Sequence, residues 1–192
     1  MNSFIKSKKK RISQGDIYQD VEFIEYAIQR KGIIDISKII FPYVIVLTQD
    51  CDLNQDYGDR LENSNTTKEK KEISQDKILI SAIVAPLYNY EHFIKGDHLS
   101  NLNMKMQNIK SKSSTTREEI LKQNNNPRYH YLKFPDDIQI VNSVIDFKHY
   151  FTVNIEYLKL HRRRNYVCQI APLYREHVSL RFSNFLSRIG LP

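Results

Sequence analysis

The stretch "YVIVLTQDCDLNQD", residues Tyr43 to Asp56, decides the fold because it joins an uncharged apolar run to a cluster of polar side chains. Tyr43–Thr48 contains β-branched, aromatic and leucine side chains and no charged residue, which is typical of a buried strand. We expect the polar residues after this strand to form a turn at the rim of a sheet. The candidate rim or pocket residues are Thr48, Gln49, Asp50 and Asn54.

Further segments have the composition of strands. Residues 14–28 predict a first strand after a Gly-Asp turn, and residues 31–40 predict a second strand or a loop leading to one. Residues 77–88 predict another apolar strand, ended by Pro86, and residues 128–134 and 146–158 predict two more. Residues 163–173 predict a short strand or an extended lead. Short strands at irregular spacing argue against a parallel, doubly wound sheet. The sequence therefore predicts a mainly β fold with helices (α+β), a small and strongly bent antiparallel β-barrel.

The remaining segments are polar or helical. Residues 1–13 predict a flexible basic tail, and residues 14–192 predict a single barrel domain. Within this domain, residues 54–76 predict a polar loop and residues 91–126 a helical insertion. A C-terminal helix is indicated by apolar residues at helical spacing, which we expect to pack on the core: Val178, Phe182, Phe185, Leu186 and Ile189.

The net charge of +7 is unevenly distributed. Residues 1–11 hold five basic and no acidic side chains, and residues 148–192 hold eight basic and two acidic ones, whereas residues 48–76 carry a net −4. Such asymmetry favours an anionic partner, most often nucleic acid. The candidate nucleic-acid-binding residues are Arg128, Arg162, Arg163 and Arg164, although the arginine triplet also fits a solvated turn.

Several classes of protein are not indicated. The chain has no apolar leader and no run of apolar residues long enough to span a membrane, so we expect a cytoplasmic protein with no membrane partner. Cys51 and Cys168 are expected to be free thiols. The sequence has no glycine-rich phosphate loop, Ser-His-Asp order or CxxC pattern, and we expect no cofactor and no metal.

Cys51 lies between two carboxylates, Asp50 and Asp52. A thiolate nucleophile needs a nearby cation or base, whereas flanking carboxylates disfavour a further negative charge. A catalytic Cys51 would therefore need His130 as its base, with Asp52 beside it. The alternatives are a metal site from Asp50, Asp52 and His130, a binding pocket without chemistry, and a structural role in which Cys51 is at least half buried and the aspartates accept hydrogen bonds.

The order of several motifs resembles the PemK/MazF toxin family, over about half of the chain. The motifs are "GDIY", "YVIVLTQD", "ISAIVAPLY", "DFKHYFTVNIEYL" and a terminal helix. The resemblance implies an SH3-like barrel, here with a helical insertion, a ribonuclease ancestry and an antitoxin partner.

Two departures from the family pattern bear on activity. The family carries an Arg-Pro pair before its apolar strand, and here Phe41 precedes Pro42, with Arg30 as a distant substitute. The family also places a Ser or Thr after its Val-x-Pro strand, whereas this chain has Leu87 and Tyr88. RNA cleavage needs a base for the 2′-hydroxyl and a cation for the phosphorane, so the family's catalytic positions are unmatched.

We therefore expect a diverged member of the toxin–antitoxin or phage-defence kind that acts on or binds RNA or DNA. The alternative is a non-catalytic module that docks on a larger defence or regulatory partner, and a Cys/His hydrolase ranks third. The expected partners are nucleic acid and a protein such as an antitoxin or defence subunit, and a homodimer is left open.

Overall fold

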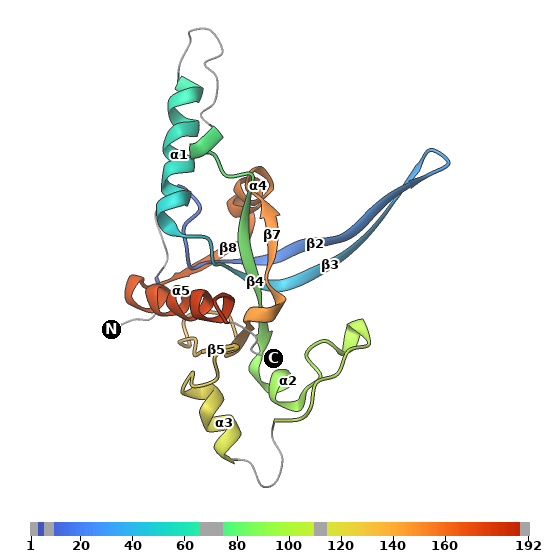
Figure 1. Cartoon of the computed structure of the whole chain (residues 1–192), viewed down its shortest axis with the longest axis vertical. Helices are drawn as coiled ribbons and strands as arrows, with labels where there is room; N and C mark the ends of the chain where they lie inside the picture. Colours follow the sequence, from blue (N-terminus) through green and yellow to red (C-terminus); the bar gives the residue numbers. More distant parts are fainter. Residues whose placement is uncertain (1–3, 6–9, 66–74, 110–114, 189–192) are drawn as a thin grey trace.

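The computed structural model describes residues 4–5, 10–65, 75–109 and 115–188, which fold into strands and helices arranged around one curled sheet (Figure 1). The strands in these ranges are β1 (Phe4–Ile5), β2 (Asp16–Arg30), β3 (Ile33–Val46), β4 (Ser81–Asn89), β5 (Tyr129–Leu132), β6 (Ser143–Asp146), β7 (Phe151–Asn154) and β8 (Tyr166–Ile170). The helices are α1 (Asp50–Asn65), α2 (Tyr90–Lys95), α3 (Thr115–Lys122), α4 (Ile155–Asn165), α5 (Pro172–Leu186) and the 3-10 turns η1 (Gln75–Lys77), η2 (Ser100–Leu102) and η3 (Phe147–His149).

Every strand pair is antiparallel. The order is β1-β8-β2-β3-β4-β6-β5, and β7 pairs with β4. The sheet curls into a half-barrel, and a C-terminal helix packs on it. The predicted α+β class, with a bent antiparallel sheet, helices in the insertion and a terminal helix, is confirmed.

The strand in "YVIVLT" is central because apolar side chains cover both of its faces. Val44 and Val46 point into a cluster with Leu158 of α4, whereas Ile45 packs in a cluster with Phe182 of α5. Val44, Ile45 and Val46 are fully buried. An uninterrupted apolar run, rather than an alternating one, is what such two-sided burial requires.

The terminal helix packs as predicted through part of its stripe. Val178 and Phe182 are buried and Phe185 is partly buried against the same cluster, but Leu186 is half exposed. Ile189 lies outside the described residues.

Several predicted boundaries are wrong. The polar segment 54–76 was expected to be a loop, but α1 occupies it as far as Asn65 and η1 follows at its end. β4 continues through Pro86 to Asn89 instead of ending at the proline, and Pro86 lies opposite Val44. The expected strand over 146–158 breaks into η3, β7 and the start of α4. This last change occurs because the Asn154 side chain caps α4 by accepting hydrogen bonds from two backbone N–H groups.

The N-terminal segment is not simply a flexible tail. Phe4 and Ile5 pair with Ile170 and Gln169 as β1, and the Phe4 ring stacks on Phe134 with centroids 4.4 Å apart. Ile12 is buried in the core. Residues 6–9, which hold most of the tail's lysines, lie outside the described residues.

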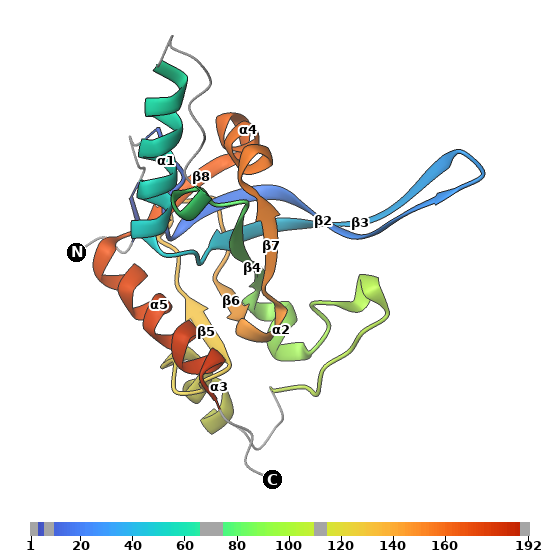
Figure 2. The same cartoon turned by 45° about the horizontal axis from the view of Figure 1, so that its top comes forward.

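The insertion and the first hairpin complete the fold. The helical prediction for residues 91–126 holds for α2, η2 and α3, while residues 110–114 are outside the described ranges. In the segment "KGIIDISKII", Lys31 and Gly32 adopt positive φ (48° and 81°) and close a two-residue hairpin, and the residues from Ile33 onward form the strand. β2 and β3 together project from the body as a long arm (Figure 2).

Candidate functional site

The stretch after the central strand begins helix α1 and not a loop. The Thr48 hydroxyl accepts a hydrogen bond from the Ile83 N–H at 2.6 Å, and the Gln49 carbonyl accepts the Leu53 N–H at 3.2 Å. Cys51, Asp52 and Asn54 are exposed on the first turns of α1. Cys51, which was expected to be at least half buried, is thus a surface residue of α1.

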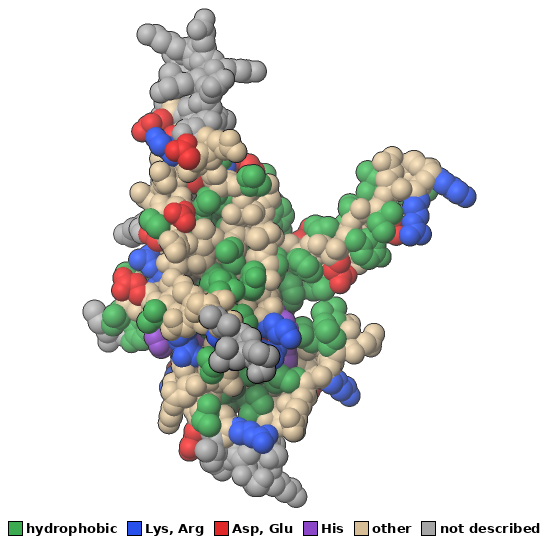
Figure 3. Space-filling model, viewed as in Figure 1, with side chains coloured by type: hydrophobic (Ala, Val, Ile, Leu, Met, Phe, Trp, Pro, Cys, Tyr) green, Lys and Arg blue, Asp and Glu red, His purple; other side chains and the backbone are tan. Residues whose placement is uncertain are grey.

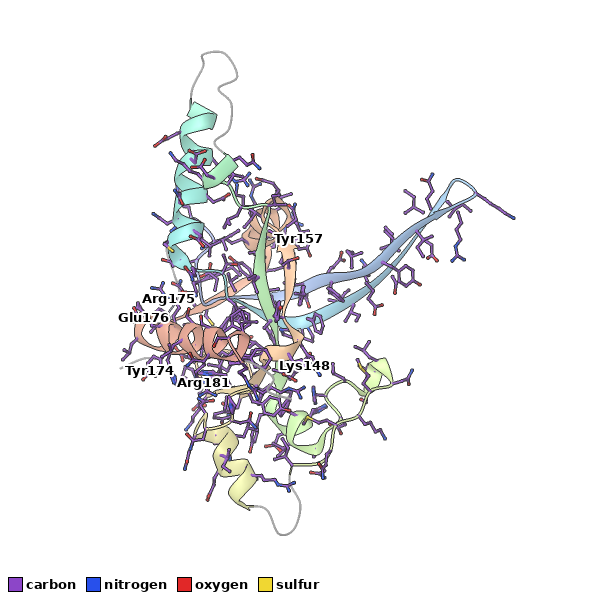
Figure 4. The ribbon with its side chains drawn as sticks, viewed as in Figure 1. Lys148, Tyr157, Tyr174, Arg175, Glu176 and Arg181 are labelled. Atoms are coloured by element: carbon purple, nitrogen blue, oxygen red, sulfur yellow. The ribbon has the colours of Figure 1, made fainter. Side chains whose placement is uncertain are left out.

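Asp50 ties three distant segments together. Its carboxylate accepts two hydrogen bonds from the Arg11 guanidinium, at 3.1 and 2.8 Å, and one from the Gln14 backbone N–H at 3.1 Å. Arg175 of α5 lies 3.5 Å away and is labelled in Figure 4. Desolvation acts to raise the pKa of Asp50, but the bonds from Arg11 and Gln14 outweigh it and hold the pKa below its ordinary value. The expectation that an aspartate of this stretch accepts arginine and backbone hydrogen bonds is confirmed.

His130 is placed as a core residue. It lies in β5, is 3% exposed, and its ring faces Phe147 and His177 with centroids 6.3 and 5.4 Å apart. Burial, with Arg181 and His177 nearby, lowers the pKa of His130 to about 3. Among the described residues, no hydrogen bond joins His130 to Cys51, whose thiol is 3.5 Å from Gln49 and Asp52 side-chain oxygens. A base this weak is poorly suited to activating a thiol at neutral pH.

A groove whose polar lining residues are mostly cationic lies between the N-terminal segment, α1 and α4. Its volume is about 380 Å³. We call it the basic groove, and its polar lining residues are Lys10, Arg11, Asp56, Tyr57, Arg60, Lys159 and Arg163. Four apolar side chains complete it: Ile12, Leu53, Leu61 and Ile155. Its five cations outnumber the three carboxylates that pair with them, Asp50, Asp56 and Glu156, and this excess of positive charge favours an anion.

The cations of the basic groove differ in how far they are already paired. Arg60 donates to Asp56 at 2.8 Å and to Glu156 at 2.5 Å, and Lys159 donates to Glu156 at 3.1 Å. Within the described residues, no hydrogen bond or ion pair is present for Lys10 or Arg163, and both are exposed. These two side chains can therefore meet an incoming anion without first breaking an internal bond.

The predicted arginines divide by position. Arg163 lines the basic groove, and Arg164 is exposed on the same helix but does not line it. The Arg162 guanidinium lies 4.6 Å from the Tyr166 ring centroid and donates to the Arg11 carbonyl at 3.1 Å, so it holds the N-terminal segment against α4. Arg128 donates to both carboxylate oxygens of the buried Asp146, at 2.8 and 2.6 Å, which is a structural role.

A second, largely apolar groove of about 430 Å³ lies at the base of the β2–β3 arm. Phe23, Phe41 and Phe151 form one wall, with ring centroids 5.0 to 6.5 Å apart. On the polar side, the Tyr88 hydroxyl and His149 Nδ1 are 3.0 Å apart. This pairing was missed because His149 was expected to alternate in a strand, whereas it ends η3.

The polar cluster of this second groove carries little positive charge. Desolvation lowers the pKa of His149, and it lowers the pKa of His98, which packs behind the groove against the Tyr88 ring, to about 4, so both imidazoles are neutral at pH 7. Neutral imidazoles attract phosphate weakly, and the basic groove is therefore the better anion site. Among the described residues, no three His, Cys, Asp or Glu side chains are placed to hold a metal ion.

Comparison with protein-family models, with curated proteins and with solved structures found no match. The PemK/MazF resemblance therefore rests on the order of its motifs alone. Within the described ranges, no helix is both long and apolar enough to cross a bilayer.

Proposed function

We propose that this protein binds nucleic acid through the basic groove, as a diverged PemK/MazF-like protein of the toxin–antitoxin or phage-defence kind. The observation that carries the proposal is the convergence of five cationic side chains from three separate segments on one groove, two of them without a described partner. Phosphate backbones bind such surfaces by releasing condensed counterions. Cleavage is not part of the proposal, because the family's catalytic arginine and threonine have no match in this chain.

The side chains around the groove suit a flexible strand. Tyr57 is partly exposed on α1 and offers a ring on which a base can stack, while Lys10 and Arg163 can contact phosphate oxygens. Contacts of this kind reach the phosphate backbone and base faces and not the base edges, so we expect weak sequence preference.

Arg163→Ala tests the proposal, with Arg164→Ala as a matched control. Both arginines are exposed neighbours on α4, but only Arg163 lines the groove. Anisotropy of labelled single-stranded RNA and DNA is measured between about 50 and 200 mM salt. Arg163→Ala is expected to weaken binding and to reduce the slope of log K against log salt by about 0.7, whereas Arg164→Ala changes the slope little.

Two results would contradict the proposal: no binding at the lowest salt, or equal effects of the two variants. Replacing the whole arginine triplet is a poorer test, because Arg162 also supports the fold through Arg11 and Tyr166.

A second function, docking on another protein without chemistry, is favoured by a different observation. The β2–β3 arm carries isoleucines that are half exposed or more, including Ile33 and Ile34 at 72% and 64%. Stable co-purification with another protein, combined with no nucleic-acid binding, would favour this alternative.

A further inference from the structure

The β2–β3 arm is a two-stranded ribbon that extends beyond the body of the molecule (Figures 1 and 2). β2 pairs with β8 only as far as Tyr18, and β3 pairs with β4 only from Val44. Residues 20–43 between these points pair with each other alone among the described strands. Two-stranded ribbons are marginally stable in water unless a face is covered.

The register separates the two faces of the arm. A bulge at Glu25 shifts the alternation of β2, so residues 22 and 24 before it lie on the same face as residues 27 and 29 after it. This face carries four cross-strand pairs: Glu22/Ile40, Ile24/Lys38, Ala27/Ile36 and Gln29/Ile34. We call this the outer face. The opposite face carries Phe23, Ile39 and Phe41, which line the apolar groove at the arm base.

The outer face is apolar and uncovered. Its four isoleucines, Ile24, Ile34, Ile36 and Ile40, are 49%, 64%, 54% and 53% exposed. Its two charged side chains pair with each other, since the Lys38 ammonium donates to Glu22 at 2.5 Å. Figure 3 shows hydrophobic side chains along the length of the arm. A row of aliphatic residues without uncompensated charge is typical of an interaction surface.

The area of the outer face matches a two-fold contact between identical arms. Burying one aliphatic carbon removes roughly 30 Å² of apolar surface, so the exposed parts of the four isoleucines amount to about 260 Å² per copy. Two copies bring together about 530 Å² of apolar surface. Polar side chains at the rim add to this area, which places the contact among the small, transient interfaces.

The charges also favour a second copy. Residues 20–43 hold four acidic and three basic side chains, net −1, whereas the whole chain carries +7. The arm is therefore a part of this basic molecule where two copies can approach without concentrating positive charge. A two-fold axis also places each isoleucine row against an equally apolar row of the same length.

We propose that two copies of this chain associate by packing the outer faces of their arms against each other. A contact of this size is typical of transient interfaces, so the dimer is reversible and its population rises with protein concentration. Because both bodies are positively charged, added salt screens their repulsion and strengthens this dimer. Assemblies bridged by nucleic acid behave in the opposite way and dissociate as salt rises.

Sedimentation velocity over a concentration series, after nuclease treatment, tests the proposal. The test variant is the double substitution Ile34→Lys and Ile36→Lys on the outer face. The matched control is Ile28→Lys and Ile33→Lys, two exposed isoleucines of the same arm that lie on the opposite face. Circular dichroism checks that both variants fold.

The wild type is expected to show a monomer–dimer equilibrium that tightens with salt. The outer-face variant should raise the dimer dissociation constant by roughly a hundredfold or more, because each substitution removes apolar burial twice in a two-fold interface. The control should change it by less than tenfold. Three results would each overturn the proposal. A wild type that stays monomeric at every concentration would favour a different protein partner, and an assembly that dissociates as salt rises would favour nucleic-acid bridging. An equal loss of dimer in both variants would show that the outer face is not the contact.

Discussion

Replacing His130 with leucine should remove one source of the acid sensitivity of the fold. His130 is 3% exposed, and desolvation, with Arg181 and His177 nearby, lowers its pKa to about 3 from an ordinary 6.5. As the pH falls below 6.5, the unfolded chain takes up a proton at this imidazole while the folded chain does not. Stability is therefore lost from pH 6.5 down to about pH 3, and it is present in full above pH 6.5.

The magnitude follows from the width of that window. Each pH unit below 6.5 costs about 1.4 kcal/mol, so lowering the pH from 7 to 5 should cost the wild type about 2 kcal/mol at this one site. Leucine has no proton to bind, and it also removes the ring nitrogen Nδ1 that has no hydrogen-bond partner in the structure. The His130→Leu variant should therefore gain about 2 kcal/mol relative to the wild type over the same pH change.

Urea unfolding at pH 7 and pH 5 measures this difference directly, and comparison with the wild type cancels the other titrating groups. His92→Gln is the control, because the His92 side chain is 63% exposed. If the stability difference between the wild type and His130→Leu were the same at both pH values, the imidazole would titrate normally. The desolvation assigned to His130 would then be wrong.

Two further predictions concern single side chains. Burial raises the pKa of Asp16 to about 6 from an ordinary 3.8, so the fold loses stability as the pH rises from about 3.8 to 6. Between pH 3.5 and pH 7 in urea titrations, Asp16→Asn should therefore gain about 3 kcal/mol of stability relative to the wild type. A stability difference that does not change with pH would contradict the burial of this carboxylate. Cys51 is exposed and Cys168 is buried, so a thiol reagent should label one cysteine in the folded protein and two after unfolding, and none in folded Cys51→Ser.

The sequence predicts a strand or helix best when the burial of that segment's own side chains determines its structure. "YVIVLT" was recognised as a central strand because core residues cover both of its faces. Helix α1 was missed because its sequence has few apolar residues and no regular stripe. Contacts with distant residues stabilise it instead: Asp50 accepts from Arg11, and Asp56 accepts from the Leu79 N–H at 2.9 Å.

The residues of the basic groove were likewise predicted only where the local sequence indicated them. Arg163 was identified because it belongs to a conspicuous run of arginines. Lys159, Arg60 and Lys10 were not, because they come from segments that are distant in sequence and meet only after folding. For the same reason the sequence could not separate Arg163 from Arg162, which differ in what their side chains touch.

Asp50 has a structural role that the stretch "QDCD" did not reveal. By holding Arg11 and the Gln14 backbone, it fixes the segment that carries Lys10 and Arg11 along the wall of the basic groove. A carboxylate beside a phosphate-binding site would ordinarily repel nucleic acid. Here its removal should release two cationic residues from their positions.

Asp50→Ala should therefore weaken nucleic-acid binding although it raises the net charge. Ordering even one released residue again costs about 1–2 kcal/mol, which corresponds to roughly tenfold in affinity. Asp52→Ala is the matched control, because Asp52 is exposed two residues away and removes the same charge. Its affinity should stay equal or increase slightly, as screened long-range attraction requires. If the two variants bound more tightly to the same extent, Asp50 would act only through its charge, and the N-terminal segment would not belong to the binding surface.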